Sequence, residues 1–434
     1  MLQALTSGAQ PVIKIASNNG HSLLIKSDGS LWVEGANSDG QLGDGTFNLA
    51  RQPEQIIPGG VTAVAAGIDR SFFIKSDGSL WAMGNNGGGA LGDGTYNGTN
   101  RPVQIVPSGV TTVSAGDNFT LFLKDDGSLW GFGFNEFGEL GDLPEFDDAV
   151  PKKIVPNGVT AIAAGQHHSL FIKNDGSLWG MGNNIDGQLG DGTKQNSKQP
   201  KLIVAANVTA VAAGSGHSLF IKNDGSLWAM GDNFWGQIGD CTRANDVYQP
   251  KQIVSSNVTA VAAGYDGSIF LKTDGSLWAM GTDFDTDYGD GISFGSWFPF
   301  VCPIQIVDGD SAPLVAGYYY DSALKSTASL WAKSFNNSGQ LVGGITNRII
   351  NPGLTVTKPP GYNFISIELL SDGNVRLTYV GKAGTNYALD RSYSLTTPNW
   401  LPQVTNTTGL DGVLVITNTP DTTQNNFWRI RSVP

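Results

Sequence analysis

The segment VTAIAAGQHHSLFIKNDGSLWGMGNNIDGQLGDGTKQNSKQPKLIV, from Val159 to Val204, is typical of four short strands. Its start is rich in small and β-branched residues, and the HSLFIK stretch alternates as a strand does. Asp175-Gly176 suits the positive φ of a tight hairpin turn. A long loop through LGDG precedes the last strand. The expected strands are Val159 to Ala164, His168 to Lys173, Ser177 to Met181 and Gln199 to Val204.

Nearly the same unit recurs along the chain, most visibly in its Ser-Leu-Trp triplets. Asp-Gly precedes the first six triplets, and Thr327-Ala328 stands before the seventh. Their tryptophans are Trp32, Trp81, Trp130, Trp179, Trp228, Trp278 and Trp331. Four-strand units of about 40–50 residues that cannot bury their faces alone indicate a β-propeller. The sequence therefore predicts an all-β protein: a seven-bladed β-propeller at residues 1–355, with few helices and with each tryptophan buried between neighbouring blades.

The repeat ends near Asn351-Pro352-Gly353, and the chain changes character. Lys358-Pro359-Pro360-Gly361 predicts a linker at 356–362. Strand patterns then return, with Asp372-Gly373 and Asp411-Gly412 as turn signals. Residues 363–434 are expected to form a small β-sandwich-like domain.

Composition narrows the function. The 434 residues hold 26 basic and 38 acidic side chains, a net charge of −12. The basic residues are scattered, which disfavours nucleic acid and an anionic membrane surface as partners. No apolar run approaches the ~20 residues of a spanning helix. Met1 to Ala9 lacks the pattern of a secretory signal, so we expect that any signal has been removed or never existed.

The sequence of the repeats resembles the regulator of chromosome condensation repeat family. That resemblance rests on His-Ser strand starts at His21, His168 and His217, and on the loops Gly40-Gln41-Leu42-Gly43-Asp44-Gly45 and Gly187-Gln188-Leu189-Gly190-Asp191-Gly192. It covers about residues 11–355 and implies a seven-bladed propeller. The family includes nucleotide-exchange factors, β-lactamase inhibitory proteins and extracellular bacterial proteins, and the regular repeats resemble the bacterial branch. The last domain resembles C-terminal β-domains of secreted planctomycete and verrucomicrobial proteins.

Catalytic motifs are scarce. The sequence has no Gly-x-Ser-x-Gly, no His-Glu-x-x-His and no phosphate-binding Gly-Lys-Ser/Thr. The repeated His-Ser pairs favour a structural role, in which each histidine packs against its own turn. One aspartate per unit also recurs beside glycine, where the side chain binds local backbone amides. These aspartates are Asp44, Asp93, Asp142, Asp191, Asp240 and Asp290.

Two features suggest a metal ion or a crosslink. Asp283, Asp285 and Asp287 alternate as in a calcium loop, but Tyr288 stands where that loop needs glycine. No cofactor is expected, with Ca²⁺ as the alternative. Cys241 replaces the loop glycine of the fifth unit, and Cys302 ends the insertion of the sixth. Both belong to the same face of neighbouring blades, so a disulfide between them fits an exported protein.

Strand topology separates the two faces of the propeller. In a four-strand meander the Asp-Gly-Ser hairpins lie on one face, and the long loops lie on the other with the turns between first and second strands. Aromatic residues outside the repeat consensus gather in the long loops and turns, and exposed aromatic clusters mark binding sites. The candidate binding residues are Phe137, Trp235, Phe284, Trp297, Phe298, Tyr318, Tyr319 and Tyr320.

These observations favour a non-catalytic recognition propeller that binds a protein or polysaccharide through its long-loop face. The expected location is extracellular or periplasmic, and the expected state is a monomer. One alternative is a carbohydrate-active hydrolase or lyase that uses loop carboxylates near the channel mouth, with candidates Asp285, Asp287, Asp290 and Glu139. A second alternative, by family analogy alone, is nucleotide exchange or chromatin binding.

Overall fold

A computed structural model describes residues 10, 12–18, 20–141, 147–281 and 300–307, and nine further strands between 311 and 432. Side chains are described up to residue 305. The chain divides into two compact units. The first comprises Met1–Asp285 and Phe298–Arg348, and the second comprises Thr286–Trp297 and Ile349–Pro434.

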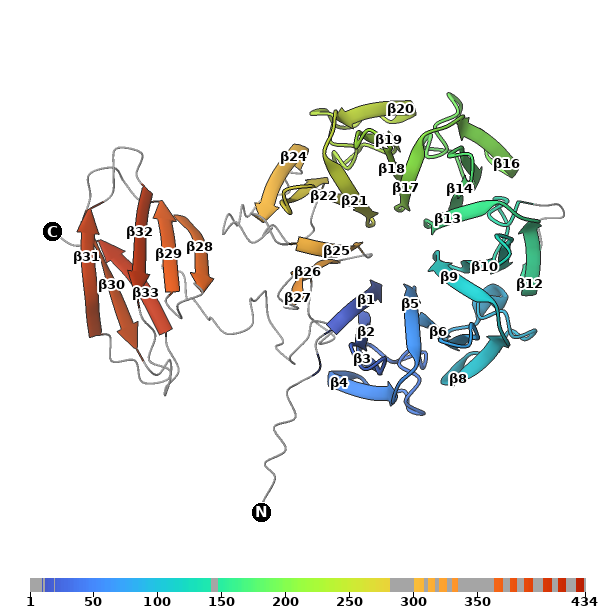
Figure 1. The fold of residues 1–434 in the computed structure, drawn as a ribbon, viewed down its shortest axis with the longest axis horizontal. Coiled ribbons are helices and arrows are strands. Elements are labelled where there is room, and N and C mark those ends of the chain that lie inside the picture. Colours follow the sequence, from blue (N-terminus) through green and yellow to red (C-terminus); the bar gives the residue numbers. More distant parts are fainter. Residues whose placement is uncertain are drawn as a thin grey trace, which may run out of the picture. The chain divides into compact units, whose positions relative to one another are not determined.

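The first unit contains six four-stranded antiparallel sheets arranged as blades around a centre (Figure 1). Each blade is a meander whose first strand is innermost. The strands are β1–β4 (Val12–Asn18, His21–Lys26, Leu31–Gly35, Ala50–Ile57), β5–β8 (Val61–Gly67, Arg70–Lys75, Leu80–Gly84, Thr99–Val106), β9–β12 (Val110–Ala115, Phe119–Lys124, Leu129–Gly133, Asp148–Val155), β13–β16 (Val159–Ala164, His168–Lys173, Leu178–Gly182, Ser197–Val204), β17–β20 (Val208–Ala213, His217–Lys222, Leu227–Gly231, Val247–Val254) and β21–β24 (Val258–Ala263, Gly267–Lys272, Leu277–Gly281, Phe300–Val307).

The all-β propeller is confirmed, but the count of seven blades is wrong, because six blades are complete. The seventh tryptophan unit forms a three-stranded sheet of β25 (Ser311–Ala316), β26 (Tyr320–Lys325) and β27 (Leu330–Ser334). Strand β25 contacts β21 on one side and β1 on the other. The seventh unit lacks both the Asp-Gly turn and the regular Leu-Gly-Asp-Gly loop. An Asp-Gly turn precedes the third strand of every complete blade.

Hairpins between the second and third strands set the register of each blade. In blade 4, Gly176 has φ 75° and its amide donates to Lys173 O at 2.9 Å. The Asp175 carboxylate accepts the Ser177 amide at 2.9 Å, and Gly176 O accepts the Val208 amide of the next blade at 2.9 Å. An added Cβ on Gly176 would lie 2.9 Å from the backbone of Asn207. Asp-Gly-Ser therefore makes the turn and also spaces the next blade.

The repeat tryptophans do wedge between blades, but they are half-buried. Trp179 packs with Leu129 and Leu140 of the preceding blade and stacks on Phe171 of its own blade, with ring centroids 6.3 Å apart. Its indole Nε1 donates to Ser177 Oγ at 2.8 Å, and Lys173 Nζ lies 4.1 Å from the ring. The expectation of full burial was wrong because this polar edge and the lysine occupy the solvent side. Trp331 lies in β27, where side chains are not described.

Buried histidines link neighbouring blades near the central channel. His168 Nε2 lies 2.8 Å from Ser218 Oγ, which itself donates to Gln188 O at 2.8 Å. The serine hydrogen is therefore committed, so His168 Nε2 carries the proton that reaches the serine. Burial lowers the pKa of His168 to about 3, so the ring is neutral. His21 and His217 make the same link to Ser71 and Ser268.

The predicted structural role of the His-Ser pairs is thereby confirmed for His21, His168 and His217. In blade 2 the histidine is replaced by Arg70, which is 1% exposed and donates to the carbonyls of Gly116, Asp117 and Phe119 in blade 3.

The second unit contains two three-stranded sheets. One has the order β28-β29-β32 and the other β31-β30-β33. Their strands are Asn363–Leu369, Val375–Val380, Val413–Asn418, Leu401–Thr407, Asn386–Ser392 and Phe427–Ser432. The one helix among the described residues is the short 3₁₀ turn η1 (Gly87–Gly89). No helix in the described part of the chain is long and apolar enough to cross a membrane.

Candidate binding face

The two faces of the propeller differ as the meander topology predicts. Inner strands run toward the long-loop face, where their ends surround a cavity of about 230 Å³. The wall is mostly alanine and glycine, and Asp117, Gln166, Ser215 and Tyr265 are among its lining residues. Ser215 Oγ donates to Gln166 Oε1 at 2.7 Å. These four polar residues belong to the turns between the first and second strands.

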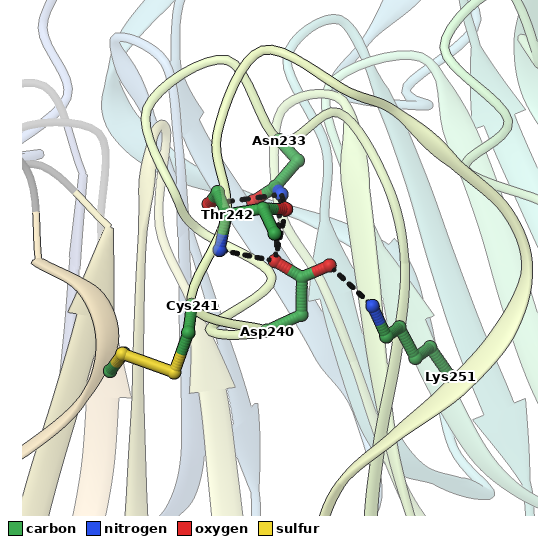
Figure 2. The surroundings of a disulfide bond; sticks show 6 residues. Asn233, Asp240, Cys241, Thr242 and Lys251 are labelled. Carbon is green, nitrogen blue, oxygen red and sulfur yellow. Dashed lines mark hydrogen bonds and ion pairs between the residues drawn. A yellow bond between two sulfur atoms is a disulfide. The ribbon is translucent and has the colours of Figure 1, made fainter.

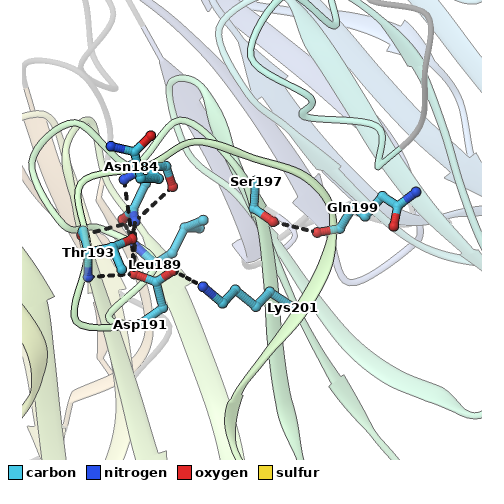
Figure 3. Close-up of polar contacts among 8 residues, drawn as sticks. Asn184, Leu189, Asp191, Thr193, Ser197, Gln199 and Lys201 are labelled. Atoms are coloured by element: carbon cyan, nitrogen blue, oxygen red, sulfur yellow. Dashed lines mark hydrogen bonds and ion pairs between the residues drawn. The ribbon is translucent and has the colours of Figure 1, made fainter.

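Each regular long loop is organised by one asparagine. In blade 4, Asn184 Nδ2 donates to Asp191 Oδ1 at 3.0 Å, and Asn184 Oδ1 accepts the Leu189 amide at 2.9 Å (Figure 3). Asp191 also accepts the Thr193 amide at 2.8 Å and is paired with Lys201. These local bonds confirm a structural role for the repeated aspartates Asp44, Asp93, Asp191 and Asp240. Asp142 and Asp290 lie outside the described residues.

Cys241 and Cys302, for which the sequence left a disulfide open, are bonded to each other (Figure 2). Cys241 has φ 66°, in the position that Gly192 occupies in blade 4 at φ 81°. The Gly192 amide donates to Tyr248 O of the next blade, and the Cys241 amide donates to Val301 O at 2.7 Å. The disulfide therefore reinforces a contact between neighbouring blades that blade 4 makes with a backbone hydrogen bond alone.

Polar side chains on the long-loop face of blades 1 and 2 satisfy one another. Asn85 Nδ2 donates to Asp39 Oδ1 at 2.8 Å, while Asn85 Oδ1 accepts the Gly87 amide at 2.7 Å. Gln41 Oε1 accepts the Asp39 amide at 3.0 Å, and its Nε2 donates to Asp69 Oδ1 at 3.3 Å. We refer to Asp39, Gln41, Asp69 and Asn85 as the amide clasp, because each carboxylate receives a side-chain amide N–H from the other blade.

Carboxylates replace the asparagine of this arrangement in blade 5. Asp232 follows the last residue of the third strand, as Asn85 does in blade 2. Its partner across the blades is Asp186, the counterpart of Asp39. A Cβ added to Gly216 would lie 3.0 Å from Asp186 Oδ2 and 3.2 Å from Asp232 Cβ. The two acids therefore pack closely against Gly216, where a side chain would crowd them.

A third acid lacks the donor that its counterpart has. Asp266 precedes the second strand of blade 6, as Asp69 precedes that of blade 2. Gln237 Nε2 donates to Asp232 Oδ2 at 2.9 Å within its own blade, whereas Gln41 reaches across to Asp69. Asp266 is 8% exposed, and no hydrogen bond or ion pair among the described residues involves its carboxylate.

The pKa values of the acids in this region reflect the missing donor and the nearby carboxylates. We refer to Asp186, Asp232, Asp246 and Asp266 as the acidic cluster. Burial and then the Asp232 carboxylate raise the pKa of Asp266 to about 7. Burial, followed by Asp232 and Asp246, raises the pKa of Asp186. Lys194 lies 3.4 Å from Asp246 at the edge of the cluster.

The two predicted aromatic residues that are described lie on different blades. Phe137 packs in blade 3 against His167, with ring centroids 5.1 Å apart. Trp235 makes an edge contact with Phe234 in blade 5, at 4.9 Å. Both are half-buried. Phe284, Trp297, Phe298, Tyr318 and Tyr319, and the acids Asp283, Asp285, Asp287 and Asp290, lie outside the described residues, and only the backbone of Tyr320 is described.

The candidate binding residues chosen from the sequence leave out several exposed apolar side chains of the long loops. Phe47, Tyr96, Ile185 and Phe234 are 54–61% exposed. Phe47 and Tyr96 directly follow Gly-Thr in their loops, and Ile185 directly follows the loop asparagine, as Phe234 does. None of the large hydrophobic side chains that are exposed in the described residues lies in an Asp-Gly-Ser hairpin. A position-by-position comparison of the repeats would have found these residues and the acidic cluster.

Glu139, a candidate catalytic acid, has a local structural explanation. It is fully buried, and its Oε2 accepts the Phe137 amide at 2.9 Å. Its Oε1 lies 3.5 Å from His167 Nδ1 of the next blade. Glu139 therefore fills the position of Gln41, and His167 fills that of Asp69. Among the described residues, no group of three His, Cys, Asp or Glu side chains converges closely enough to hold a metal ion.

Comparison with known proteins agrees with this architecture. A family model described as RCC1-like domain matches residues 2–239, more than half of the chain. A second model, the regulator of chromosome condensation (RCC1) repeat, matches residues 224–271. A comparison with curated protein sequences finds no significant match.

Solved propellers are similar in fold. Human WBSCR16 has 20% identity and a TM-score of 0.65, covering 74% of this chain and 88% of that one. Prp20p from Saccharomyces cerevisiae, described with its binding to Gsp1p and histones, has 20% identity and a TM-score of 0.62, covering 73% and 84%. Yeast RCC1 (Prp20) bound to Kap60 has 20% identity and a TM-score of 0.63, covering 83% and 87%. Identities of 20% show the fold alone, and the family match carries the assignment: the chain belongs to the RCC1-like domain family.

Proposed function

We propose that the chain is a non-catalytic recognition propeller whose long-loop face binds a protein partner. The exposed apolar residues of the long loops carry this proposal. Phe47, Tyr96, Ile185 and Phe234 contribute to none of the described core clusters. Binding residues concentrate on loops that a rigid scaffold holds in place, and exposed apolar side chains with a polar rim are typical of protein interfaces.

The acidic cluster supports a protein rather than a polysaccharide as the partner. Protein surfaces offer cationic side chains that a carboxylate can pair with, whereas a neutral polysaccharide does not. The Cys241–Cys302 disulfide supports an extracellular or periplasmic location, because such bonds persist in oxidising compartments. The protein-binding descriptions of Prp20p and of yeast RCC1 with Kap60 support protein recognition as a use of this fold. We propose a monomer that acts without a cofactor.

A crosslinking experiment tests the face. A photo-reactive amino acid is placed at Phe234 in one variant and at Asp175, in the opposite hairpin face, in the other. Each variant is incubated with the proteins of its native source, and the crosslinked partner is identified and purified. We expect crosslinking from position 234 and none from position 175. Affinity for the purified partner should fall roughly tenfold or more in Phe234→Ala. Crosslinking from position 175 alone would show that the wrong face has been chosen.

A further inference from the structure

We propose that the mouth of the central channel binds a small neutral molecule with several hydroxyl groups, of the size of a monosaccharide. The inference goes beyond the proposed function, because the exposed apolar residues that carry that function lie in the long loops. The site is the cavity of about 230 Å³ at the ends of the inner strands. Ser17 and Asn18 of blade 1 line this cavity together with Asp117 of blade 3.

The wall of the cavity is nearly constant from blade to blade, and blade 1 departs from it. In blades 2 to 6 the inner strand leads into an Ala-Gly pair at Ala66-Gly67, Ala115-Gly116, Ala164-Gly165, Ala213-Gly214 and Ala263-Gly264. Ser17 and Asn18 occupy these two positions in blade 1, since Asn18 pairs with His21 as Gly67 pairs with Arg70. Among the six complete blades, blade 1 alone therefore places a hydroxyl and an amide where the others have a methyl group and a hydrogen.

Both of these polar side chains contain a buried oxygen that lacks a hydrogen-bond partner. Ser17 is 5% exposed, and its Oγ has no partner among the described residues. Asn18 Nδ2 donates to Ala66 O at 3.5 Å, whereas no donor in the described part of the chain reaches the buried Asn18 Oδ1. A buried polar group without a partner destabilises a fold. Because alanine and glycine serve at the same positions in the other blades, the cost points to a ligand that completes these hydrogen bonds.

The position that directly follows the Ala-Gly pair differs in every one of these blades. Blades 2 to 6 have Ile68, Asp117, Gln166, Ser215 and Tyr265 there. Ser215 Oγ donates to Gln166 Oε1 at 2.7 Å, and the Gln166 side chain is hydrogen-bonded to the Asp117 carboxylate. Variable residues above a constant wall are typical of a recognition site on a rigid scaffold.

The groups that remain for a ligand are mainly acceptors. A carboxylate can accept about four hydrogen bonds, so Asp117 retains capacity beyond its bond with Gln166. Asn18 Oδ1 is an acceptor only, and the Ser17 hydroxyl can either accept or donate. A ligand that matches them must therefore supply several hydrogen-bond donors.

The charges around Asp117 favour neutral donors over a cation. Burial raises the pKa of Asp117, while its hydrogen bond with Gln166 and the charges of His167 and Arg70 oppose that rise. Arg70 is itself buried and donates to the carbonyl oxygens of Gly116 and Asp117. A cationic ligand would meet a carboxylate whose charge already has a counterion, beside a guanidinium that repels it. Hydroxyl groups supply donors without this repulsion.

The size of the cavity agrees with one sugar ring. An apolar cavity of about 150 Å³ holds a benzene molecule. The channel mouth, at about 230 Å³, therefore has room for a six-membered ring that carries hydroxyl groups.

Binding of simple sugars tests the site directly. D-glucose, D-galactose, D-mannose, D-xylose and L-rhamnose are titrated separately into the full-length protein, in which the alanine methyl groups carry ¹³C. Alanines form much of the wall, so a ligand in the channel shifts their methyl resonances. We expect saturable shifts with at least one of these sugars, and weaker binding of putrescine, the cationic probe.

Variants of blade 1 separate the site from the rest of the face. Ser17→Ala combined with Asn18→Gly restores the pair of the other blades and should weaken sugar binding roughly tenfold or more, because two hydrogen-bonding groups are lost. Asp117→Asn should weaken it severalfold. Ser38→Ala is the matched control, since it removes an exposed blade 1 hydroxyl that is bonded to Asp39 outside the cavity. It should leave sugar binding unchanged.

Each outcome decides the proposal. If none of these sugars gives saturable shifts, water alone fills the channel and the proposal is overturned. Wild-type affinity in the double variant, with thermal unfolding showing that it is folded, also overturns the site. Putrescine binding that is tighter than that of every sugar overturns the choice of a neutral ligand. Retained binding in Ser38→Ala together with loss in the double variant supports the site.

Discussion

The junction of blades 1 and 2 has the same backbone arrangement as the junctions of blades 4, 5 and 6. The side chains at equivalent positions differ. At the junction of blades 1 and 2, Asn85 donates to Asp39 and Gln41 donates to Asp69, so each acid of the amide clasp has a hydrogen-bond donor. At the junctions of blades 4, 5 and 6, one asparagine position is occupied by Asp232, which faces Asp186 and attracts Gln237 away from Asp266. A single change of residue type, from asparagine to aspartate, therefore replaces a hydrogen-bond donor between two blades with a second carboxylate.

The acidic junction also carries the covalent bond. Like charges that face each other destabilise a folded state, and blade 5 is joined to blade 6 by Cys241–Cys302 where blade 4 relies on Gly192. Strain or repulsion at a functional site persists only where the surrounding structure holds it. The disulfide is well placed to do so.

Among the changes that separate these two regions, removal of the disulfide should have the largest effect on the free energy of unfolding. The two cysteines are 61 residues apart, and closing a loop of this size stabilises a fold by about 4 kcal/mol in the chain-entropy description. We expect Cys241→Gly combined with Cys302→Ser to lose about that much in denaturant unfolding. The Gly variant restores the residue of the other blades at positive φ. Cys241→Ser with Cys302→Ser should be less stable again by ~1 kcal/mol. A double variant as stable as the wild type would contradict the stabilising role.

Glu34 is a buried acid that lies in the core of a blade rather than on the long-loop face. It lies in β3 where Met83, Met181 and Met230 lie in other blades, it is fully buried, and neither oxygen has a hydrogen-bond partner among the described residues. Burial raises its pKa to about 8 from 4.5. Between these values the folded protein retains a proton that the unfolded chain releases, so stability falls as pH rises through this window.

Glu34→Met should therefore stabilise the protein by ~3 kcal/mol at pH 8 to 9, the upper range for a buried group without partners. At pH 4, where both states are protonated, the charge-dependent part of this gain should vanish. Unfolding at the two pH values measures it. An unchanged gain across this pH range would contradict the raised pKa.

The repeats made the strands and loops of the propeller predictable. They did not show which side chains of adjacent blades meet. Copies of one unit reveal strands, hairpins and the faces on which loops lie, and the position of Cys241 within its unit was enough to suggest its pairing with Cys302. The acidic cluster depends on which side chains of adjacent units meet. Asp39 and Asn85 are 46 residues apart, and only the register between blades shows that they touch. The blade count failed where the seventh unit departs from the repeat, since the inference extrapolated from its tryptophan alone.

Asp266→Asn should raise stability by less than Glu34→Met. Its pKa is about 7 against 3.8 for an ordinary aspartate, so wild-type stability falls as pH rises between these values. Because 8% of Asp266 remains in contact with solvent, we expect a gain of ~1–2 kcal/mol at pH 8 and little at pH 3.5. Lower stability of Asp266→Asn at pH 8 would contradict the raised pKa of Asp266.

The smallest effect, and the most direct exchange of the two regions, comes from the reciprocal pair Asp232→Asn and Asn85→Asp. In Asp232→Asn the new side chain can accept the Phe234 amide and donate to Asp186, as Asn85 does with Gly87 and Asp39. Gln237 is then free to reach Asp266. We expect a gain of ~0.5–1.5 kcal/mol, the net worth of one such hydrogen bond, and a similar loss in Asn85→Asp. Added salt should shrink both differences, because part of each is repulsion between half-exposed charges. Thermal unfolding of both variants at low and high ionic strength provides the measurement. Two changes of the same sign would show that the two blade junctions do not share one hydrogen-bond geometry.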